Sequence, residues 1–194
     1  MRRLGWLFIG FAFAFVALIL AAIGFVRATG LDARGDASGL ETRLARAVRP
    51  LAVPSEAKAR RNPVLLTPEI MEEAMGHFAD HCASCHANDG SGNTELGRGL
   101  YPKAPDMRLP ATQEMSDGEL FYVIEHGVRF TGMPAWSTGT PAGEVSTWHL
   151  VHFIRHLPRL SEAELERMQQ LNPRSPDEVR QEIEEERFLN EGVN

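Results

Sequence analysis

The hydrophobic pattern of the chain begins with a run of 23 residues, Leu4 to Val26, that contains no charged residue and follows Arg2 and Arg3. As a helix it would be roughly 34 Å long at about 1.5 Å per residue, enough to cross the hydrocarbon core of a bilayer. A cleaved signal peptide is the alternative, but its apolar region spans only about 7 to 15 residues. We therefore predict a retained anchor over residues 1–26. The two arginines favour the amino end inside and the rest of the chain outside.

The next strong pattern is an apolar stripe with a spacing of four residues, which begins after Thr67-Pro68. Proline is common at the first position of a helix, so this pair marks a helix start. The stripe consists of Ile70, Ala74 and Phe78 and leads to Cys82. Residues 88–99 and 101–106 follow, rich in glycine and proline, and predict loops.

Two further helices are predicted before residue 160. One begins near Ser116 with capping-box spacing and ends near His126-Gly127. The other runs from about Glu144 to Leu157 and is stopped by Pro158. Its apolar face, which predicts packing against the helix after Thr67, consists of Leu150, Phe153, Ile154 and Leu157. Residues 67–160 therefore predict an all-α domain with long loops.

Polar segments flank this domain. Residues 27–66 form a basic tether with a weakly apolar helix over Glu41–Arg49 that should end at Pro50. The tether is either a flexible coil, about 35 Å from end to end, or a segment packed along the domain. Residues 161–194 form an acidic tail with two short predicted helices, the second running from 176 to about Leu189. Phe188 and Leu189 could dock this tail, although a solvated helix is the simpler expectation.

Composition and charge limit the function further. The 194 residues are 43% hydrophobic and 24% charged with a net charge of −6, so neither a disordered chain nor a basic nucleic-acid binder fits. The net charge is +2 over residues 1–26, +4 over 27–66, −6 over 67–160 and −6 over 161–194. The partners we expect therefore include a membrane but not nucleic acid.

The candidate chemistry lies in Cys82-Ala83-Ser84-Cys85-His86, which contains both cysteines of the chain. A Cys-x-x-Cys-His spacing is typical of covalent attachment of c-type haem. Each thiol can add to a haem vinyl group, and the adjacent imidazole of His86 can reach the iron. A redox pair, a disulfide or half a zinc site would leave the adjacent histidine unexplained.

The second axial ligand of the iron decides the function. Met133 is favoured because Gly132 permits close approach of the backbone and Pro134 stiffens the loop. The alternatives are Met107, Met115, which should instead pack before a helix cap, and the histidines at 77, 81 and 126. A buried loop methionine without a ligand role also remains open.

With the glycines of Asn88–Gly92, the stretch Gly127–Pro134 and the aromatic last helix, this motif resembles the class I c-type cytochromes over about residues 67–158. The resemblance implies one haem bound by Cys82, Cys85 and His86, with Met133 completing the coordination. It also implies a proline whose carbonyl holds the proximal imidazole, Pro105 or Pro102, of which we favour Pro105. Ala87 departs from the family, in which glycine is usual at this position.

Two further groups of residues need an interpretation. Trp148 lies off the apolar face of its helix and is expected to cover the haem or to fill a groove. His149, His152 and His156 lie on one helical arc and could bind a metal, but a polar helix flank is the simpler reading.

The sequence thus predicts a membrane-anchored monohaem electron carrier on the periplasmic face, not an enzyme. A haem subunit of a larger oxidase or dehydrogenase complex is the close alternative. A sensor or peroxidase with an open iron position is a more distant one, because Met133 would fill that position.

Overall fold

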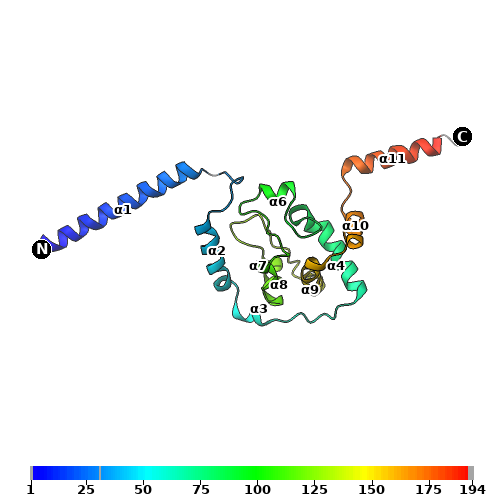
Figure 1. Ribbon diagram of the computed structural model, residues 1–194, viewed down its shortest axis with the longest axis horizontal. Coiled ribbons are helices and arrows are strands. Elements are labelled where there is room, and N and C mark those ends of the chain that lie inside the picture. The colour runs from blue at the N-terminus through cyan, green and yellow to red at the C-terminus, as the bar shows by residue number, and fades with distance from the viewer. Residues whose placement is uncertain (1, 31, 192–194) are drawn as a thin grey trace. The chain divides into compact units, whose positions relative to one another are not determined.

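The computed structural model describes residues 2–30 and 32–191, and these residues form helices and loops without any strand. The chain divides into two compact units, one up to Gly35 and one from Asp36 onward. Figure 1 shows the order of the helices along the chain. The all-α fold class is confirmed.

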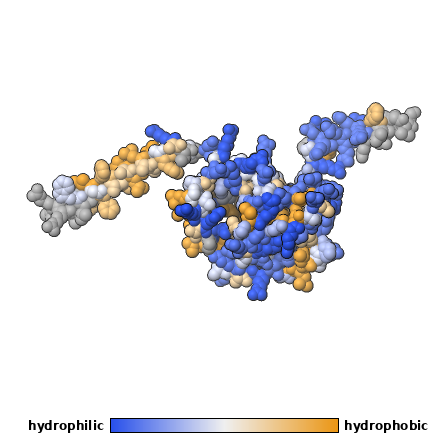
Figure 2. All heavy atoms as spheres, viewed as in Figure 1, coloured by the Kyte–Doolittle hydropathy of each residue, from blue (hydrophilic) through white to orange (hydrophobic). Residues whose placement is uncertain are grey.

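The first unit consists mainly of α1 (Arg2–Thr29). Residues Phe8–Ala28 are long and apolar enough to cross a membrane, and none of this span is buried within the protein. Its surface is hydrophobic along most of its length (Figure 2). The predicted membrane anchor is therefore supported by an exposed apolar helix that no part of the described chain covers.

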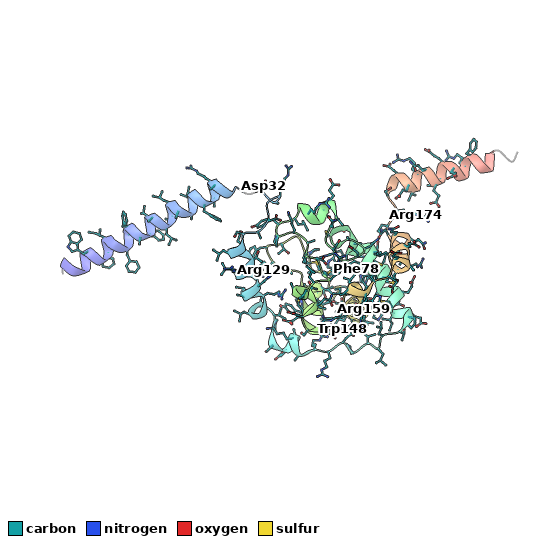
Figure 3. All side chains as sticks on the ribbon, viewed as in Figure 1. Asp32, Phe78, Arg129, Trp148, Arg159 and Arg174 are labelled. Atoms are coloured by element: carbon teal, nitrogen blue, oxygen red, sulfur yellow. The ribbon has the colours of Figure 1, made fainter. Side chains whose placement is uncertain are left out.

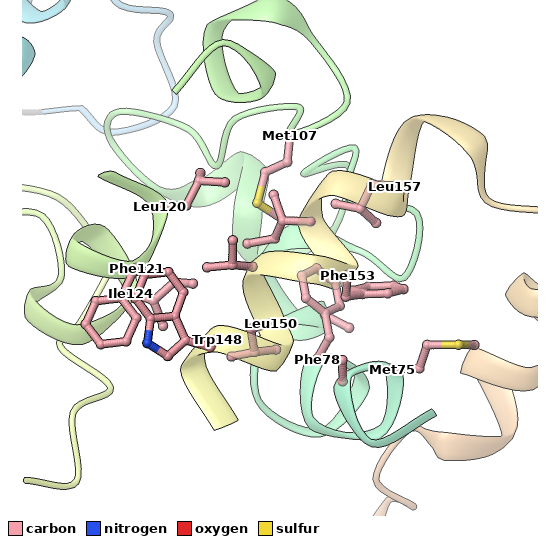
Figure 4. Packing of buried hydrophobic residues seen from close by; sticks show 14 of the residues in the cluster. Met75, Phe78, Met107, Leu120, Phe121, Ile124, Trp148, Leu150, Phe153 and Leu157 are labelled. Atoms are coloured by element: carbon pink, nitrogen blue, oxygen red, sulfur yellow. The ribbon is translucent and has the colours of Figure 1, made fainter. Parts of the chain in front are cut away.

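The core of the second unit is formed by α4 (Pro68–His81), α8 (Asp117–His126) and α9 (Pro141–His156). Phe78 and Phe153 join α4 to α9, with ring centroids 4.9 Å apart (Figure 4). Leu150, Phe153, Ile154 and Leu157 are all buried, which confirms the predicted apolar face of α9.

Local capping explains where these helices begin. The Thr67 side chain accepts a hydrogen bond from the amide of Ile70, and Ser116 forms the predicted capping box with Glu119. The start of α9 lies three residues before the predicted Glu144. Thr140 accepts a hydrogen bond from the amide of Gly143 at 3.1 Å and is followed by proline. This capping pair starts the helix earlier than its apolar residues alone would indicate.

Three short helices lie between α4 and α8: α5 (Ala83–His86), α6 (Glu95–Gly99) and α7 (Pro110–Gln113). The prediction of an uninterrupted loop over 88–99 is wrong at α6. Thr94 caps this helix by accepting a hydrogen bond from Gly97 at 2.8 Å. A Cβ atom at Gly97 would lie 2.6 Å from the carbonyl oxygen of Gly92. Glycine at this position therefore allows close packing of the backbone and does not mark a flexible loop.

The segment before α4 packs along the domain from Asp36 to Val64 and is not a flexible coil. It contains α2 (Gly39–Ala52) and α3 (Ser55–Ala59). The predicted stop at Pro50 is wrong, because α2 continues to Ala52. Contacts that hold the segment include Lys103 with Asp36, Ser116 Oγ with the carbonyl of Lys58, and Asn62 with the carbonyl of Trp148.

The tail forms two helices, as predicted, after a short 3-10 turn, η1 (Leu157–Arg159). The first, α10 (Glu162–Leu171), packs on α4 through the fully buried Met168 and an ion pair between Arg167 and Glu72. The second is α11 (Pro176–Glu191), in which Phe188 is exposed. This exposure agrees with the expected solvated helix, and the alternative of docking on the domain through Phe188 is not seen in the described chain. The side chain of Leu189 lies outside the described residues.

Candidate haem site

The two cysteines and His86 lie on one helical turn at the junction of α4 and α5. Cys82 ends α4, and its carbonyl accepts hydrogen bonds from the amides of Cys85 at 3.1 Å and His86 at 2.9 Å. The two cysteines form no disulfide with each other and are partly exposed. Burial, and to a lesser extent the neighbouring Cys85, raises the pKa of the Cys82 thiol to about 12, so this thiol is uncharged at neutral pH.

His86 presents an uncharged imidazole. Burial lowers its pKa, and the backbone carbonyl of Pro105 opposes this by favouring the protonated ring. The buried Nδ1 atom has no aligned hydrogen-bond partner. A neutral imidazole is the form that binds a metal ion, and metal-bound histidines commonly donate the other ring N–H to a carbonyl.

Pro105 is held near His86 by contacts between two loops. The amide of Gly92 donates to the carbonyl of His86 at 2.8 Å, and the amide of Met107 donates to the carbonyl of Gly90 at 2.8 Å. A Cβ atom at Gly92 would lie 3.1 Å from the carbonyl oxygen of Pro105. The loop that contains Pro105 is thus fastened to the loop that follows the cysteine motif.

Arg108 strengthens this connection and was not singled out by the sequence. Its guanidinium binds Asp106 and Asp89 at 2.8 Å each, so it joins the same two loops. Asp106 raises the pKa of Arg108, and hydrogen bonding from Arg108 lowers the pKa of Asp106. The sequence carries no signal for this contact, because Asp89 and Arg108 lie 19 positions apart.

Ala87 has a backbone conformation that only glycine adopts readily. Its φ is +60° and its ψ is 158°. Ala87, which departs from the cytochrome pattern, therefore lies at a position where the positive φ favours the usual glycine. The chain keeps the turn, because the amide of Ala87 still donates to Ala83 at 2.8 Å and its carbonyl accepts from Gly90 at 3.0 Å.

Met133 lies in a loop that folds back on the end of α8. Its carbonyl accepts a hydrogen bond from Val128 at 3.0 Å, and its amide donates to the Thr131 hydroxyl at 3.1 Å. Gly127, with φ +65°, begins this loop, and a side chain there would meet Pro134 at 2.6 Å. These contacts fix the backbone on both sides of the methionine.

The three candidate methionines differ in their surroundings. Met107 and Met115 belong to the buried hydrophobic core, whereas Met133 is only partly buried and lies outside that core. The thioethers of Met107 and Met115 are thus used in packing (Figure 4 for Met107). Met133 alone of the three leaves its sulfur uncommitted to that core.

Together these residues offer what a covalently attached haem requires: two cysteines on one turn, an adjacent neutral imidazole near a carbonyl that can accept its second ring N–H, and a loop methionine outside the core. The residues present therefore fit haem c. The same set does not resemble a zinc site, and the described residues contain no cluster of three metal-binding acidic, histidine or cysteine side chains.

Residues 70–154 match the family described as cytochrome c oxidase, cbb3-type, subunit III. This segment is a c-type cytochrome domain. The cbb3-type cytochrome c oxidase subunit FixP of Sinorhizobium medicae (strain WSM419) is 36% identical over 74 residues, and that of Rhizobium meliloti (strain 1021) is 35% identical. Each match covers 36% of this chain and only 22% of the relative.

The cytochrome domain carries covalently bound haem c, which confirms the predicted cofactor. The predicted resemblance to c-type cytochromes is likewise confirmed. The individual haem ligands stay predictions.

In the cytochrome domain Trp148 fills the space between α8 and α9. Its ring is 3% exposed and stacks on Phe121 with centroids 4.2 Å apart, and the guanidinium of Arg60 lies over both rings. Figure 3 places Trp148 and Phe78 among the side chains of the domain. Trp148 thus fills a groove against Phe121, which is one of its two expected roles. A contact between Trp148 and the haem stays a prediction.

The three histidines of α9 each contact a different element. His149 pairs with Glu73 of α4 at 3.2 Å, His152 contacts the carbonyl of Val64 at 2.8 Å, and His156 pairs with Glu164 of α10 at 2.8 Å. They form no shared metal site among the described residues. Their common arc instead fastens α9 to its neighbours.

Proposed function

We propose that this chain is a membrane-anchored cytochrome that carries one haem and transfers single electrons. Haem iron supplies a one-electron redox couple when it is bound. Cys82 and Cys85 would hold the ring, while His86 and Met133 would ligate the iron. With both of these ligands supplied by the protein, no position would be left for a substrate, which suits electron transfer.

The observation that carries this proposal is the difference between Met133 and the other two methionines. Met107 and Met115 are committed to the core, whereas Met133 is held in a loop by backbone contacts on both sides. A fixed thioether ligand favours electron transfer over ligand binding and raises the reduction potential relative to other ligand sets.

His86 and the groups around it would orient the proximal side. The buried ring favours its neutral form, and the Pro105 carbonyl stands near it as an acceptor for the Nδ1–H. Arg108 would keep Pro105 in position by joining the two loops. None of these residues moves a proton in the proposed function, which is consistent with a chain that is not itself an enzyme.

We propose further that the cytochrome works within a membrane oxidase complex of the cbb3 type. The two curated relatives, of which this chain matches 22%, are subunits of such oxidases by name. Residues 67–160, which include the cytochrome domain, contain twelve acidic and six basic residues, so the redox partner should present a basic or largely apolar surface. Arg2 and Arg3 favour the periplasmic face for this domain.

The test uses the full chain, tagged and purified in mild detergent from cells that attach haem c. We expect one covalent haem per chain, spectra of a six-coordinate haem in both redox states, and no shift on addition of carbon monoxide to the reduced protein. Carbon monoxide binding would contradict electron transfer as the sole role and favour a sensor. Copurification of oxidase catalytic subunits would support the complex, and a chain that purifies alone and exchanges electrons with soluble proteins would support a free carrier.

A further inference from the structure

Helix α2 carries an apolar stripe that nothing in the described chain covers. The stripe consists of Leu40, Leu44, Val48 and Leu51, whose side chains are 68%, 57%, 55% and 83% exposed. Spacings of four, four and three residues place them on one face of the helix. Figure 2 shows hydrophobic surface at the edge of the domain where α2 lies in Figure 1.

The stripe is free because α2 contacts the domain through other positions. Glu41 accepts a hydrogen bond from the Tyr101 hydroxyl at 2.8 Å, and Arg49 donates to the carbonyl of Ala111 at 2.9 Å. The helix itself is well formed, since Ser38 and Glu41 make a capping box at its start. It is therefore a stable helix with its apolar face directed away from those contacts.

Positive charge lies beside the stripe. Arg43 and Arg46 are exposed, and no ion pair with either is found in the described residues. On a helical projection Arg43 falls on the flank of the stripe away from Glu41, whereas Arg46 lies further round, on the face opposite the stripe. An apolar face with arginine at its edge is the arrangement of helices that lie in a membrane interface and bind anionic headgroups.

The position of α2 in the chain brings it to a membrane. Only ten residues separate the end of the candidate span at Ala28 from the start of α2 at Gly39. Ten residues reach at most about 35 Å, so α2 stays near the leaflet from which α1 emerges. We propose that α2 lies in the interface of that leaflet, with its stripe among the acyl chains and Arg43 on anionic lipids.

This contact would orient the cytochrome domain. Because α2 is fastened to the domain by Glu41 and Arg49, a helix lying flat in the interface holds the domain against the membrane in one orientation. The proposal is independent of the haem ligands and of the redox partner. The cytochrome domain would then rest on the bilayer rather than move at the end of a flexible coil.

The test measures the depth of spin labels on the full holoprotein in vesicles of phosphatidylcholine with and without phosphatidylglycerol. A label on Leu44→Cys should lie about 5–10 Å below the headgroups and be more accessible to oxygen than to a water-soluble nickel complex. A label on Gln169→Cys, an exposed position of α10, is the matched control and should show the reverse. Labelling of the unmutated chain sets the background from the native cysteines.

The charge is tested by Arg43→Gln in the Leu44→Cys chain, which should make the label shallower in vesicles that contain phosphatidylglycerol. Arg46→Gln, an exposed arginine on the opposite face of α2, is the matched control and should leave the depth unchanged. Equal depth with and without Arg43 would overturn the role of anionic lipid. A label at 44 that is as water-accessible as the one at 169 would overturn the membrane contact. An immobilised label reached by neither reagent would overturn it as well, in favour of a contact between two copies of the chain.

Discussion

Gly118 at the start of α8 and the carbonyl group of Ala57 in α3 are in such close contact that no side chain fits between them. A Cβ atom at Gly118 would lie 3.0 Å from the carbonyl carbon of Ala57 and 2.9 Å from the carbonyl oxygen of Arg60. Because these are backbone atoms, they cannot turn aside as a flexible side chain would. Gly118 is therefore one of the positions at which the segment before α4 packs tightly on the cytochrome domain.

We expect Gly118→Ala to destabilise the protein by about 2 kcal/mol, since the added methyl group must push α3 away from α8. Unfolding in guanidinium would measure this loss, and limited proteolysis should show faster cleavage within residues 36–60. Gly76→Ala is the matched control. No atom lies within 4 Å of its added Cβ, so this helix-interior change should stabilise by about 0.5–1 kcal/mol. Equal stability of the two variants would refute the proposed contact.

Ala87→Gly should stabilise the protein by about 1 kcal/mol. A non-glycine residue in this conformation costs on the order of 1–3 kcal/mol, part of which is offset by the greater freedom of glycine in the unfolded chain. Thermal unfolding, followed by circular dichroism, would detect the gain. Ala142→Gly, at an exposed helical position of α9, should instead cost about 1 kcal/mol. A loss at both positions would show that Ala87 is not strained.

Met133→Ala should leave the haem attached but open the iron to carbon monoxide. The far-red absorption band of methionine-ligated ferric haem should disappear, and the reduction potential should shift. Met107→Leu is the control. It removes a thioether from the core at a cost below about 1.5 kcal/mol and should keep the band. Persistence of the band in Met133→Ala would assign the ligand to another residue.

Replacing Cys82 or Cys85 by alanine should weaken covalent haem retention, because each thiol would form one of two bonds to the ring. Haem of the unmutated chain should stay with the protein in acidified organic solvent. Haem of a chain with both changes should extract. Free extraction from the unmutated chain would contradict covalent attachment through this motif.

Stability should fall as the pH drops below about 7, in part through His77. Burial, together with the neighbouring His81, lowers the pKa of His77 from its usual 6.5. Below that value the unfolded chain binds more protons than the folded protein, so the free energy of unfolding decreases until the pH passes the folded pKa. His77→Gln should therefore lose less stability between pH 8 and pH 5 than the unmutated chain.

The control for this titration is Gln169→Ala, at an exposed position of α10 that carries no titratable group. This change should leave the difference in stability between pH 8 and pH 5 unaltered. Urea unfolding at both pH values would provide the comparison. An equal pH dependence in His77→Gln and the unmutated chain would show that His77 is not responsible.

Much of this protein follows from short stretches of its sequence. The uncharged run predicts α1 because a bilayer requires about 20 apolar residues, whatever the rest of the chain does. Thr67 and Ser116 predict helix starts because a capping hydrogen bond spans only three residues. The cysteine motif predicts haem c because its attachment geometry fits within one helical turn. Each of these features depends only on residues close together in the chain, so it can be predicted from the sequence alone.

The tertiary structure decided what depends on residues far apart in the chain. Arg108 meets Asp89 across 19 positions, and Arg60 covers Trp148 across 88, so neither pairing leaves a periodic trace in the sequence. The histidines of α9 look like one cluster along their helix, yet the elements packed around it give each a separate partner. In α2 the sequence shows only a thin apolar stripe. The folded chain determines that this stripe stays exposed, because packing energy depends on which surfaces meet and not on the order of residues in one helix.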